Sequence, residues 1–382
     1  LRYTIYSRFK DSSGNTRFLR RTKSISRPAF SALYELAPGQ KYYVDGFKLE
    51  VQRIGLPANY NARFVITCDA CATVSEYTPN GNERFAECPK CGAQGQFITE
   101  VVELKQVYSE MNFEDSQITD SESDREKVKQ STEVFFGNRQ SAEARSCSWV
   151  SADQKYAIEM RTQEEVFMIN RNVELTSDGL EPKFFKICPD CGAIPLKNGT
   201  TNSDSKAISR RHAITCPRRA LPLADSDLRP VSIYASMISD VMHFVVFYRR
   251  QIPTVKAALR ALFNLHLKGD SSHLQMVART IRTYDDGQLH LLSIYDSVVG
   301  GSGHLRSLMI FQDDQIDRSE GLKRLMSLAK DTADKIAACE CSIDGHGCYK
   351  CLLSHENQFE HDMISKREAI EWLLGLSAVN RW

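Results

Sequence analysis

The residues of this chain with the clearest chemistry are its cysteines, most of which occur in close pairs. Eleven of the twelve cysteines, together with one histidine, fall into three groups of four: Cys68, Cys71, Cys88 and Cys91; Cys188, Cys191, His212 and Cys216; and Cys339, Cys341, Cys348 and Cys351. Zinc prefers four ligands of this kind in a tetrahedron, with each sulfur about 2.3 Å from the metal. We therefore expect three structural zinc ions, with no open coordination position for hydrolysis.

The first site uses two C-x-x-C turns. Cys68-Asp69-Ala70-Cys71 and Cys88-Pro89-Lys90-Cys91-Gly92 are separated by 16 residues, enough for a short hairpin. The glycine after the second pair allows a positive φ at the end of the knuckle. The alternatives are two disulfides or a fortuitous spacing, but close C-x-x-C pairs in a chain without a secretory signal are typical of metal ligands.

The second site combines a knuckle with a histidine. Cys188-Pro189-Asp190-Cys191-Gly192 has the same pattern as the second knuckle of the first site. The H-x-x-x-C spacing lets His212 and Cys216 lie on one face of a helical turn, where both can reach the metal. The alternative for His212 is an ordinary polar surface residue.

The third site is compact. Cys339-Glu340-Cys341 and Cys348-Tyr349-Lys350-Cys351 are joined by a short stretch in which Gly345 and Gly347 permit a tight return. His346 lies between the pairs, but four thiolates already fill the zinc shell.

The whole chain has the composition of a globular protein. Of its 382 residues, 42% are hydrophobic and 25% charged, and the length predicts two or three domains. The sequence has no run of about 18 apolar residues and no secretory signal, so we expect no membrane span and a cytoplasmic location. It begins Leu1-Arg2-Tyr3, and we expect a piece of a longer protein. The remaining cysteine, Cys147, is interpreted as a small buried residue near Trp149.

The helices and strands that must position these ligands suggest an α+β, multi-domain fold, in which zinc-ribbon and knuckle modules precede a C-terminal α/β zinc-binding domain. The expected units are a β-rich N-terminal segment, a zinc ribbon, an acidic linker or exposed helix, a β-rich segment with the Cys3His knuckle, and the C-terminal domain; they span residues 1–60, 61–108, 109–140, 141–228 and 229–382. Asp45-Gly46 predicts a hairpin turn in the first unit.

The C-terminal domain has the clearest periodicity. The pattern predicts a buried strand over 239–247, a helix over 254–267 after Pro253, strands around 273–283 and 289–296, a helix over 319–338, and a closing helix that begins at Ser365 with a capping box.

A glycine-rich loop follows the last of these strands. Free backbone N–H groups there could bind a DNA phosphate; the residues are Gly300, Gly301, Ser302 and Gly303. The alternative is a tight turn that needs glycine for steric reasons. Asp296 and His304 flank the loop and raise the hypothesis of a nuclease, although the sequence supplies no evident third catalytic partner.

Two clusters of basic residues suit contacts to phosphates. The first surrounds the second zinc site, with only Asp190 and Asp204 as acids, and comprises Lys183, Lys186, Lys197, Lys206, Arg210, Arg211, Arg218 and Arg219; of these, we expect Lys186 and the four arginines to contact DNA. The second comprises Arg2, Arg8, Lys10, Arg17, Arg20, Arg21, Lys23 and Arg27, against the single acid Asp11. The alternatives are a solvated basic face or docking to an acidic surface such as residues 110–126.

Two runs in the C-terminal region resemble a known family. The first is Ile294-Tyr295-Asp296-Ser297-Val298-Val299-Gly300-Gly301-Ser302-Gly303; the second is Cys339-x-Cys341 with Cys348-Tyr349-Lys350-Cys351-Leu352, then Asn357-Gln358 and His361. Together they are similar to the MrfA-type zinc-binding (MZB) domain family over about residues 230–375. The resemblance implies that the third site holds zinc. It also implies that the domain lies C-terminal to the motor of a superfamily 2 DNA helicase, or in a partner subunit.

This family occurs in DNA repair and in bacterial antiphage systems such as Druantia (DruE-like) and DISARM (DrmB-like). The chain has no G-x-x-x-x-G-K-[ST] and no Asp-Glu-x-His box, so a motor that binds and hydrolyses ATP is expected before Leu1 or in another subunit. The resemblance therefore implies a helicase region that contributes DNA binding and partner docking in antiphage defence or repair, with other defence-system subunits as further partners. The alternatives are a non-catalytic scaffold subunit that binds a helicase, and the nuclease.

Overall fold

The computed structural model describes residues 1–10, 12–57, 60–80, 83–118, 130–137, 146–176, 179–194, 212–219, 227–268, 271–282, 287–298, 300–308, 310–312 and 315–379. Within these residues the fold is mixed α+β, as predicted.

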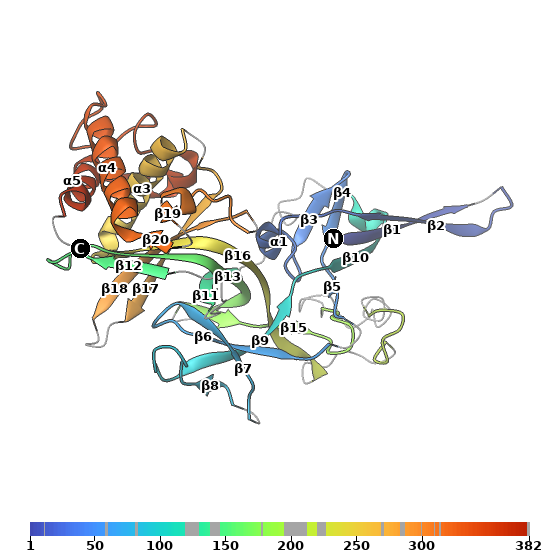
Figure 1. The fold of residues 1–382 in the computed structure, drawn as a ribbon. Coiled ribbons are helices and arrows are strands. Elements are labelled where there is room, and N and C mark those ends of the chain that lie inside the picture. Colours follow the sequence, from blue (N-terminus) through green and yellow to red (C-terminus); the bar gives the residue numbers. More distant parts are fainter. Residues whose placement is uncertain are drawn as a thin grey trace.

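A 12-stranded sheet forms the centre of the molecule (Figure 1). Its strands are, in spatial order, β12 (Ser146–Val150), β13 (Ala157–Thr176), β11 (Gln130–Gly137), β7 (Thr73–Tyr77), β6 (Arg63–Thr67), β9 (Gln96–Glu103), β16 (Arg229–Val246), β18 (Gln288–Asp296) and β17 (Leu274–Arg282). Beside this path, β14 (Gly179–Lys183), β15 (Phe185–Ile187) and β8 (Phe85–Ala86) pair with β13, β16 and β9. The two longest strands, β13 and β16, also pair with each other, and this pairing joins the β12-β13-β11 part of the sheet directly to the β16-β18-β17 part.

Strand β16 shows why this sheet is stable. Most of its residues are buried on both faces, which explains a nearly continuous apolar run in place of alternation. Its N-terminal half pairs with β15 and runs parallel to β9, while its C-terminal half pairs with β18. One strand therefore joins the first ribbon, the second knuckle and the C-terminal domain.

A smaller sheet has the order β2-β1-β10-β5, formed by β1 (Arg2–Lys10), β2 (Thr16–Ser24), β10 (Val107–Asn112) and β5 (Arg53–Ile54). β1 and β2 extend past their neighbours as a projecting hairpin, called the arm below (residues 2–24; Figure 1). Nearby, β3 (Lys41–Val44) and β4 (Phe47–Glu50) form the predicted hairpin. Asp45 and Gly46 have φ values of 50° and 78°, as a two-residue turn requires.

The three longest described helices gather over the sheet at the end away from the arm, whereas α1 (Ala29–Glu35) lies nearer the arm (Figure 1). α3 (Ile252–His266), α4 (Arg318–Ala337) and α5 (Lys366–Ser377) pack against one another and against β16 and β18 in the largest core cluster. Cys147 and Trp149 are both buried in this cluster, as predicted. The capping box at the start of α5 is confirmed in part: the Ser365 hydroxyl accepts the N–H of Glu368 at 3.2 Å, whereas the N–H of Ser365 donates to the Thr254 hydroxyl at 3.0 Å and not to the Glu368 side chain.

Short elements complete the described chain. They are α1 (Ala29–Glu35), β19 (Ile310–Gln312), β20 (Gln315–Asp317) and the 3-10 helices η1 (Glu114–Ser116), η4 (Arg249–Gln251), η5 (Arg306–Leu308) and η6 (His355–Met363). Among the described helices, none is long and apolar enough to cross a membrane.

The predicted helices and strands of the C-terminal domain occur within a few residues of their expected bounds, except that the strand expected over 239–247 is β16, which begins at Arg229. The acidic linker expected over residues 109–140 differs, because it contains the end of β10 and all of β11. β11 is a sheet strand because its apolar run Val134-Phe135-Phe136 is buried between β7 and β13. The acidic residues that suggested a linker lie mainly in 119–129, outside the described residues.

Candidate metal centres

The first centre lies where two hairpins of the central sheet end. Cys68 and Cys71 occupy the turn between β6 and β7, and Cys88 and Cys91 occupy the turn between β8 and β9. The sulfur atoms of Cys68 and Cys91 are 3.6 Å apart, and those of Cys71 and Cys88 are 3.7 Å apart. The sheet therefore brings both C-x-x-C turns to one point.

The second centre is the most buried of the three, with all four predicted ligands inside the protein. Nδ1 of His212 lies 3.3 Å from the sulfurs of both Cys191 and Cys216, and the sulfurs of Cys188 and Cys216 are 3.9 Å apart. Residues 212–219 form turns where a helical turn was expected, yet His212 and Cys216 still meet at one point. Burial lowers the pKa of His212, which favours the neutral imidazole that a metal requires.

The third centre follows the end of α4. The sulfurs of Cys339 and Cys348 are 3.5 Å apart, and those of Cys341 and Cys351 are 3.7 Å apart. His346 points elsewhere, since its Nδ1 lies 2.8 Å from the carbonyl oxygen of Ile364. The prediction of four thiolates without His346 therefore agrees with the geometry.

These distances fit a shared metal ion and not disulfides. A tetrahedron with zinc–sulfur bonds of about 2.3 Å has edges of about 3.8 Å, and the sulfur pairs given above lie 3.5–3.9 Å apart. A disulfide would need about 2.0 Å, and all twelve cysteines are free. Within each group the candidate ligand atoms lie within 4.8 Å of one another. The three donor sets thus fit structural zinc, which would join separate turns at each site.

The segment that carries the third centre matches a known family model. Residues 255–352 match the family model of the MrfA Zn-binding domain. This MZB segment contains most of α3, all of β17, β18 and α4, and all four ligands of the third centre. The resemblance drawn from the sequence runs is therefore confirmed for the segment.

Two further comparisons concern the whole chain. A solved structure, described as the DUF1998 helicase MrfA bound to DNA, is similar with 12% sequence identity and a TM-score of 0.39. The match covers 99% of this chain and 34% of that chain, so this chain spans about a third of its length. No curated protein matches the sequence.

A buried lysine supports the third centre from outside the MZB segment. Lys366, the first residue of α5, is 1% exposed, and its Nζ donates to the carbonyl oxygens of Cys339 (2.7 Å) and Cys341 (2.9 Å). A tetrathiolate zinc site carries net negative charge, so a buried ammonium at its backbone is electrostatically favourable. Sequence reasoning missed this residue because a lysine in a helical first turn is typical of a solvent-exposed position.

The second knuckle packs against β5, which sequence reasoning also missed. The N–H of Ile54 donates to the carbonyl of Gly192 at 2.9 Å, and that of Ile194 donates to Gln52 at 2.9 Å. Ile54 and Ala193 are fully buried at this contact. The second zinc site therefore connects to the sheet that carries the arm.

The glycine loop is held by the protein's own groups. Gly300 N–H donates to the Ile238 carbonyl at 3.0 Å, and Gly301 N–H donates to Val298 at 2.8 Å. The buried Asp296 carboxylate accepts the N–H of Val298 at 2.9 Å and that of Ser302 at 2.5 Å. These N–H groups were expected to be free for a phosphate, and they have internal acceptors instead.

This arrangement favours the tight-turn interpretation. Gly300, Gly301 and Gly303 all have φ between 77° and 85°, where glycine is preferred. Asp296 caps the loop and is not presented to a substrate. His304 stacks on His273, with ring centroids 5.2 Å apart.

Fewer of the basic residues around the second centre are available for contacts to DNA phosphates than their number in the sequence suggested. Arg218 pairs with Asp190 at 2.7 Å, within the zinc knuckle. Arg219 is exposed, and Lys186 is partly buried in β15. Arg210 and Arg211 lie outside the described residues.

Proposed function

We propose that this chain is the zinc-binding part of a superfamily 2 DNA helicase, and that it holds DNA mainly through the arm. The MZB match and the three four-ligand centres support the family part of this proposal. The observation that carries the DNA-binding part is a row of exposed cations on a projecting hairpin.

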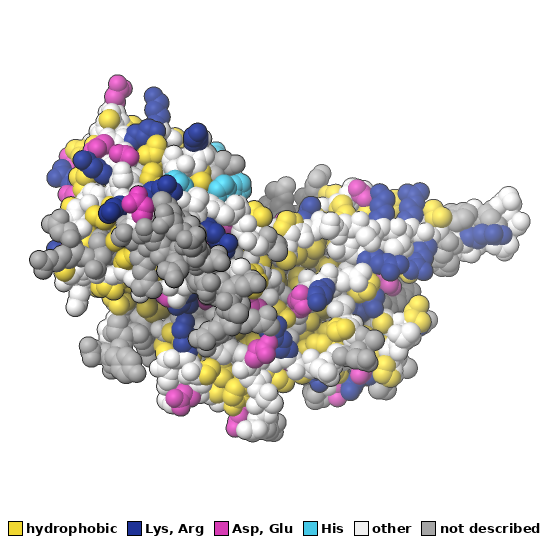
Figure 2. Space-filling model, in the orientation of Figure 1, with side chains coloured by type: hydrophobic (Ala, Val, Ile, Leu, Met, Phe, Trp, Pro, Cys, Tyr) yellow, Lys and Arg dark blue, Asp and Glu magenta, His cyan; other side chains and the backbone are white. Residues whose placement is uncertain are grey.

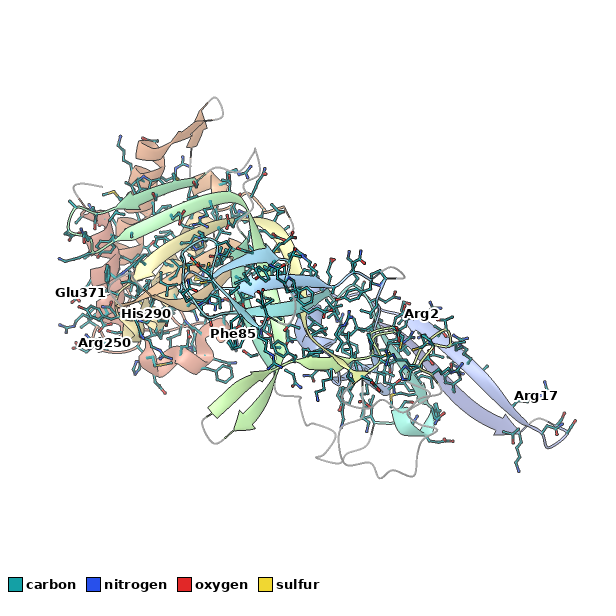
Figure 3. The ribbon with its side chains drawn as sticks, turned by 90° about the horizontal axis from the view of Figure 1, so that it is seen from below. Arg2, Arg17, Phe85, Arg250, His290 and Glu371 are labelled. Carbon is teal, nitrogen blue, oxygen red and sulfur yellow. The ribbon has the colours of Figure 1, made fainter. Side chains whose placement is uncertain are left out.

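The arm presents basic side chains along its length (Figure 2). Those that are exposed are Arg2, Lys10, Arg17, Arg20, Arg21 and Lys23. Arg2 lies at the base and Arg17 toward the tip (Figure 3). A stripe of this kind attracts a polyanion and releases the counterions of DNA when it binds.

The base of the arm is rigid, which suits a DNA-positioning role. Tyr3 and Ile5 are buried, and the Tyr3 hydroxyl donates to Asp45 at 2.5 Å. Beyond this anchor, Arg20 and Arg21 are exposed and lie opposite Tyr6 and Ile5 in the β1–β2 register. Successive strand residues point to opposite faces, so these two arginines serve both faces of the arm.

The test is a salt titration of DNA binding with two matched double variants. Arg20→Gln with Arg21→Gln should weaken binding to labelled duplex DNA and reduce the slope of log affinity against log salt by about 2, since each duplex phosphate contact contributes about 0.9. The control is Arg249→Gln with Arg250→Gln, two adjacent exposed arginines of η4; Arg250 lies at the end of the molecule opposite the arm tip (Figure 3). No binding at low salt, or equal loss in both variants, would overturn the arm as the DNA contact.

The wider context is also part of the proposal. A motor in the same longer chain or in another subunit would supply ATP binding and hydrolysis, and the chain would dock it to DNA and to further subunits in antiphage defence or repair. Thiolate ligands of this kind suit a reducing cytoplasm. Arg219 and Lys186 would add DNA contacts near the second centre. The sequence upstream of Leu1 tests the motor; a chain that binds a helicase but no DNA would instead be a scaffold subunit.

A further inference from the structure

A cavity of about 610 Å³ opens between α3, α4 and the third zinc knuckle. This volume is in the range of small-ligand sites. Its apolar lining includes Ala257, Ala261, Leu265, Ile336 and Leu352. The cavity therefore has an apolar wall formed by two helices and a metal-supported turn.

The polar lining of this cavity is cationic. Lys268, Lys335 and Lys350 line it and are exposed, and none forms an ion pair with another described residue. Arg260 also lines it, but it donates to the carbonyls of Ser271 and Leu274 at 2.7 Å and forms an ion pair with Glu356 at 2.5 Å, so it is already neutralised. None of the described lining residues is acidic.

An aromatic ring completes the lining. Tyr349 lies between the ligands Cys348 and Cys351, and its side chain is 65% exposed. The ring of Tyr349 meets the ring of His361 edge to face, with the two centroids 5.6 Å apart and an angle of 82° between the ring planes. Because Tyr349 lies within the C-x-x-C turn, a zinc ion held by Cys348 and Cys351 would fix its backbone beside the cavity.

Some of these lysines have simpler local roles. Lys335 lies in the last turn of α4, where a cation complements the helix dipole. The thiolates of the third centre also attract cations, although the ammonium of Lys366 already donates to the backbone carbonyls of Cys339 and Cys341. Neither role explains why Lys350 and Tyr349 face the same apolar cavity.

We infer that this pocket binds one unpaired nucleotide of a DNA strand, with the base against the apolar wall and Tyr349, and the phosphates at the three lysines. This inference rests on the proposed DNA-binding function. Aromatic stacking together with cations along the backbone is the general chemistry of single-strand recognition. A base within a duplex cannot enter, so the pocket should distinguish unpaired from paired DNA.

The test compares a blunt duplex with the same duplex that carries a thymidine overhang of roughly eight nucleotides, within the usual range of single-strand sites. The full chain should bind the overhang substrate at least about five-fold more tightly, because stacking one base changes affinity by about that factor or more. Lys335→Gln with Lys350→Gln, and separately Tyr349→Ala, should abolish this preference and leave blunt-duplex affinity unchanged. Tyr349→Phe should retain it.

The matched control is Lys330→Gln, an exposed lysine on α4 that does not line the cavity. Metal content is measured for each variant. An unchanged overhang preference in the lysine and tyrosine variants would overturn the inference, as would loss of zinc in the lysine variant, which would assign those cations to the thiolates. Displacement of the overhang by free thymidine monophosphate at equal affinity would assign the pocket to a mononucleotide. Failure of the proposed function is distinct, because neither substrate would then bind.

Discussion

Two glycines in equivalent positions give a controlled test of how the second centre is joined to the fold. Gly92 and Gly192 each follow the second cysteine of a Cys-Pro-x-Cys-Gly knuckle, with φ values of 73° and 72°. A Cβ at Gly192 would lie 2.1 Å from the carbonyl oxygen of Ile54, whereas the nearest atom to a Cβ at Gly92 is the side-chain oxygen of Glu87 at 3.5 Å. Alanine therefore imposes the same backbone strain at both sites and a clash at only one.

The two substitutions should differ in magnitude for that reason. Alanine in the left-handed region costs about 1–2 kcal/mol, which is the whole effect expected for Gly92→Ala. Gly192→Ala must also move the knuckle off β5, which breaks the 2.9 Å bond from Ile54 N–H to the Gly192 carbonyl. A buried group left without its partner costs about 1–3 kcal/mol, and overpacking costs about 1–3 kcal/mol. We expect an excess of about 2–6 kcal/mol for Gly192→Ala on these terms.

Urea unfolding of the two zinc-loaded variants measures this difference directly. Zinc content and duplex binding are measured alongside, because a knuckle displaced from β5 should weaken DNA binding through the arm and retain its metal. Equal destabilisation by the two alanines, within about 0.5 kcal/mol, would refute the close approach of Gly192 to Ile54.

Three further predictions concern buried groups and the metal. Lys366→Met should lower the free energy of unfolding by about 2–5 kcal/mol and speed zinc release from the third centre, because the carbonyls of Cys339 and Cys341 lose a charged donor. Urea unfolding measures the first effect and a chelator assay the second. The matched control, Lys330→Met at an exposed position, should change neither quantity. Burial lowers the pKa of His243 from 6.5 to about 3. Between these two pH values only the unfolded chain binds this proton, so the free energy of unfolding falls as the pH falls through that window. His243→Gln should therefore reduce the slope of the free energy of unfolding against pH by up to about 1.4 kcal/mol per pH unit. Metal analysis should return three zinc ions per chain, and a chelator should cause loss of structure because zinc contributes folding energy; fewer than two ions would contradict the count.

What the sequence could predict depended on how local the signal was. The ligand sets follow from cysteine spacing within short turns, and the cap at Ser365 and the turn at Asp45-Gly46 are equally local, so all were found. The packing of Gly192 on Ile54 and the burial of Lys366 join segments far apart in the chain, and no pattern within one window encodes such contacts. The strand β11 was missed because its apolar run is brief and stands beside an acidic stretch.

The second zinc centre has a mechanical role in this architecture. The arm sheet joins the central sheet through the chain between β5 and β6, through the step from β9 to β10, and through a shared apolar core that includes Ile54, Val107 and Ile233. A further connection runs from β5 to the knuckle at Gly192, and from the knuckle through β15 to β16. The second centre therefore adds a polar, metal-supported restraint on the arm beside the apolar core. Removing the second zinc should leave the MZB segment folded and its pocket intact, while the arm loses one of the contacts that orient it.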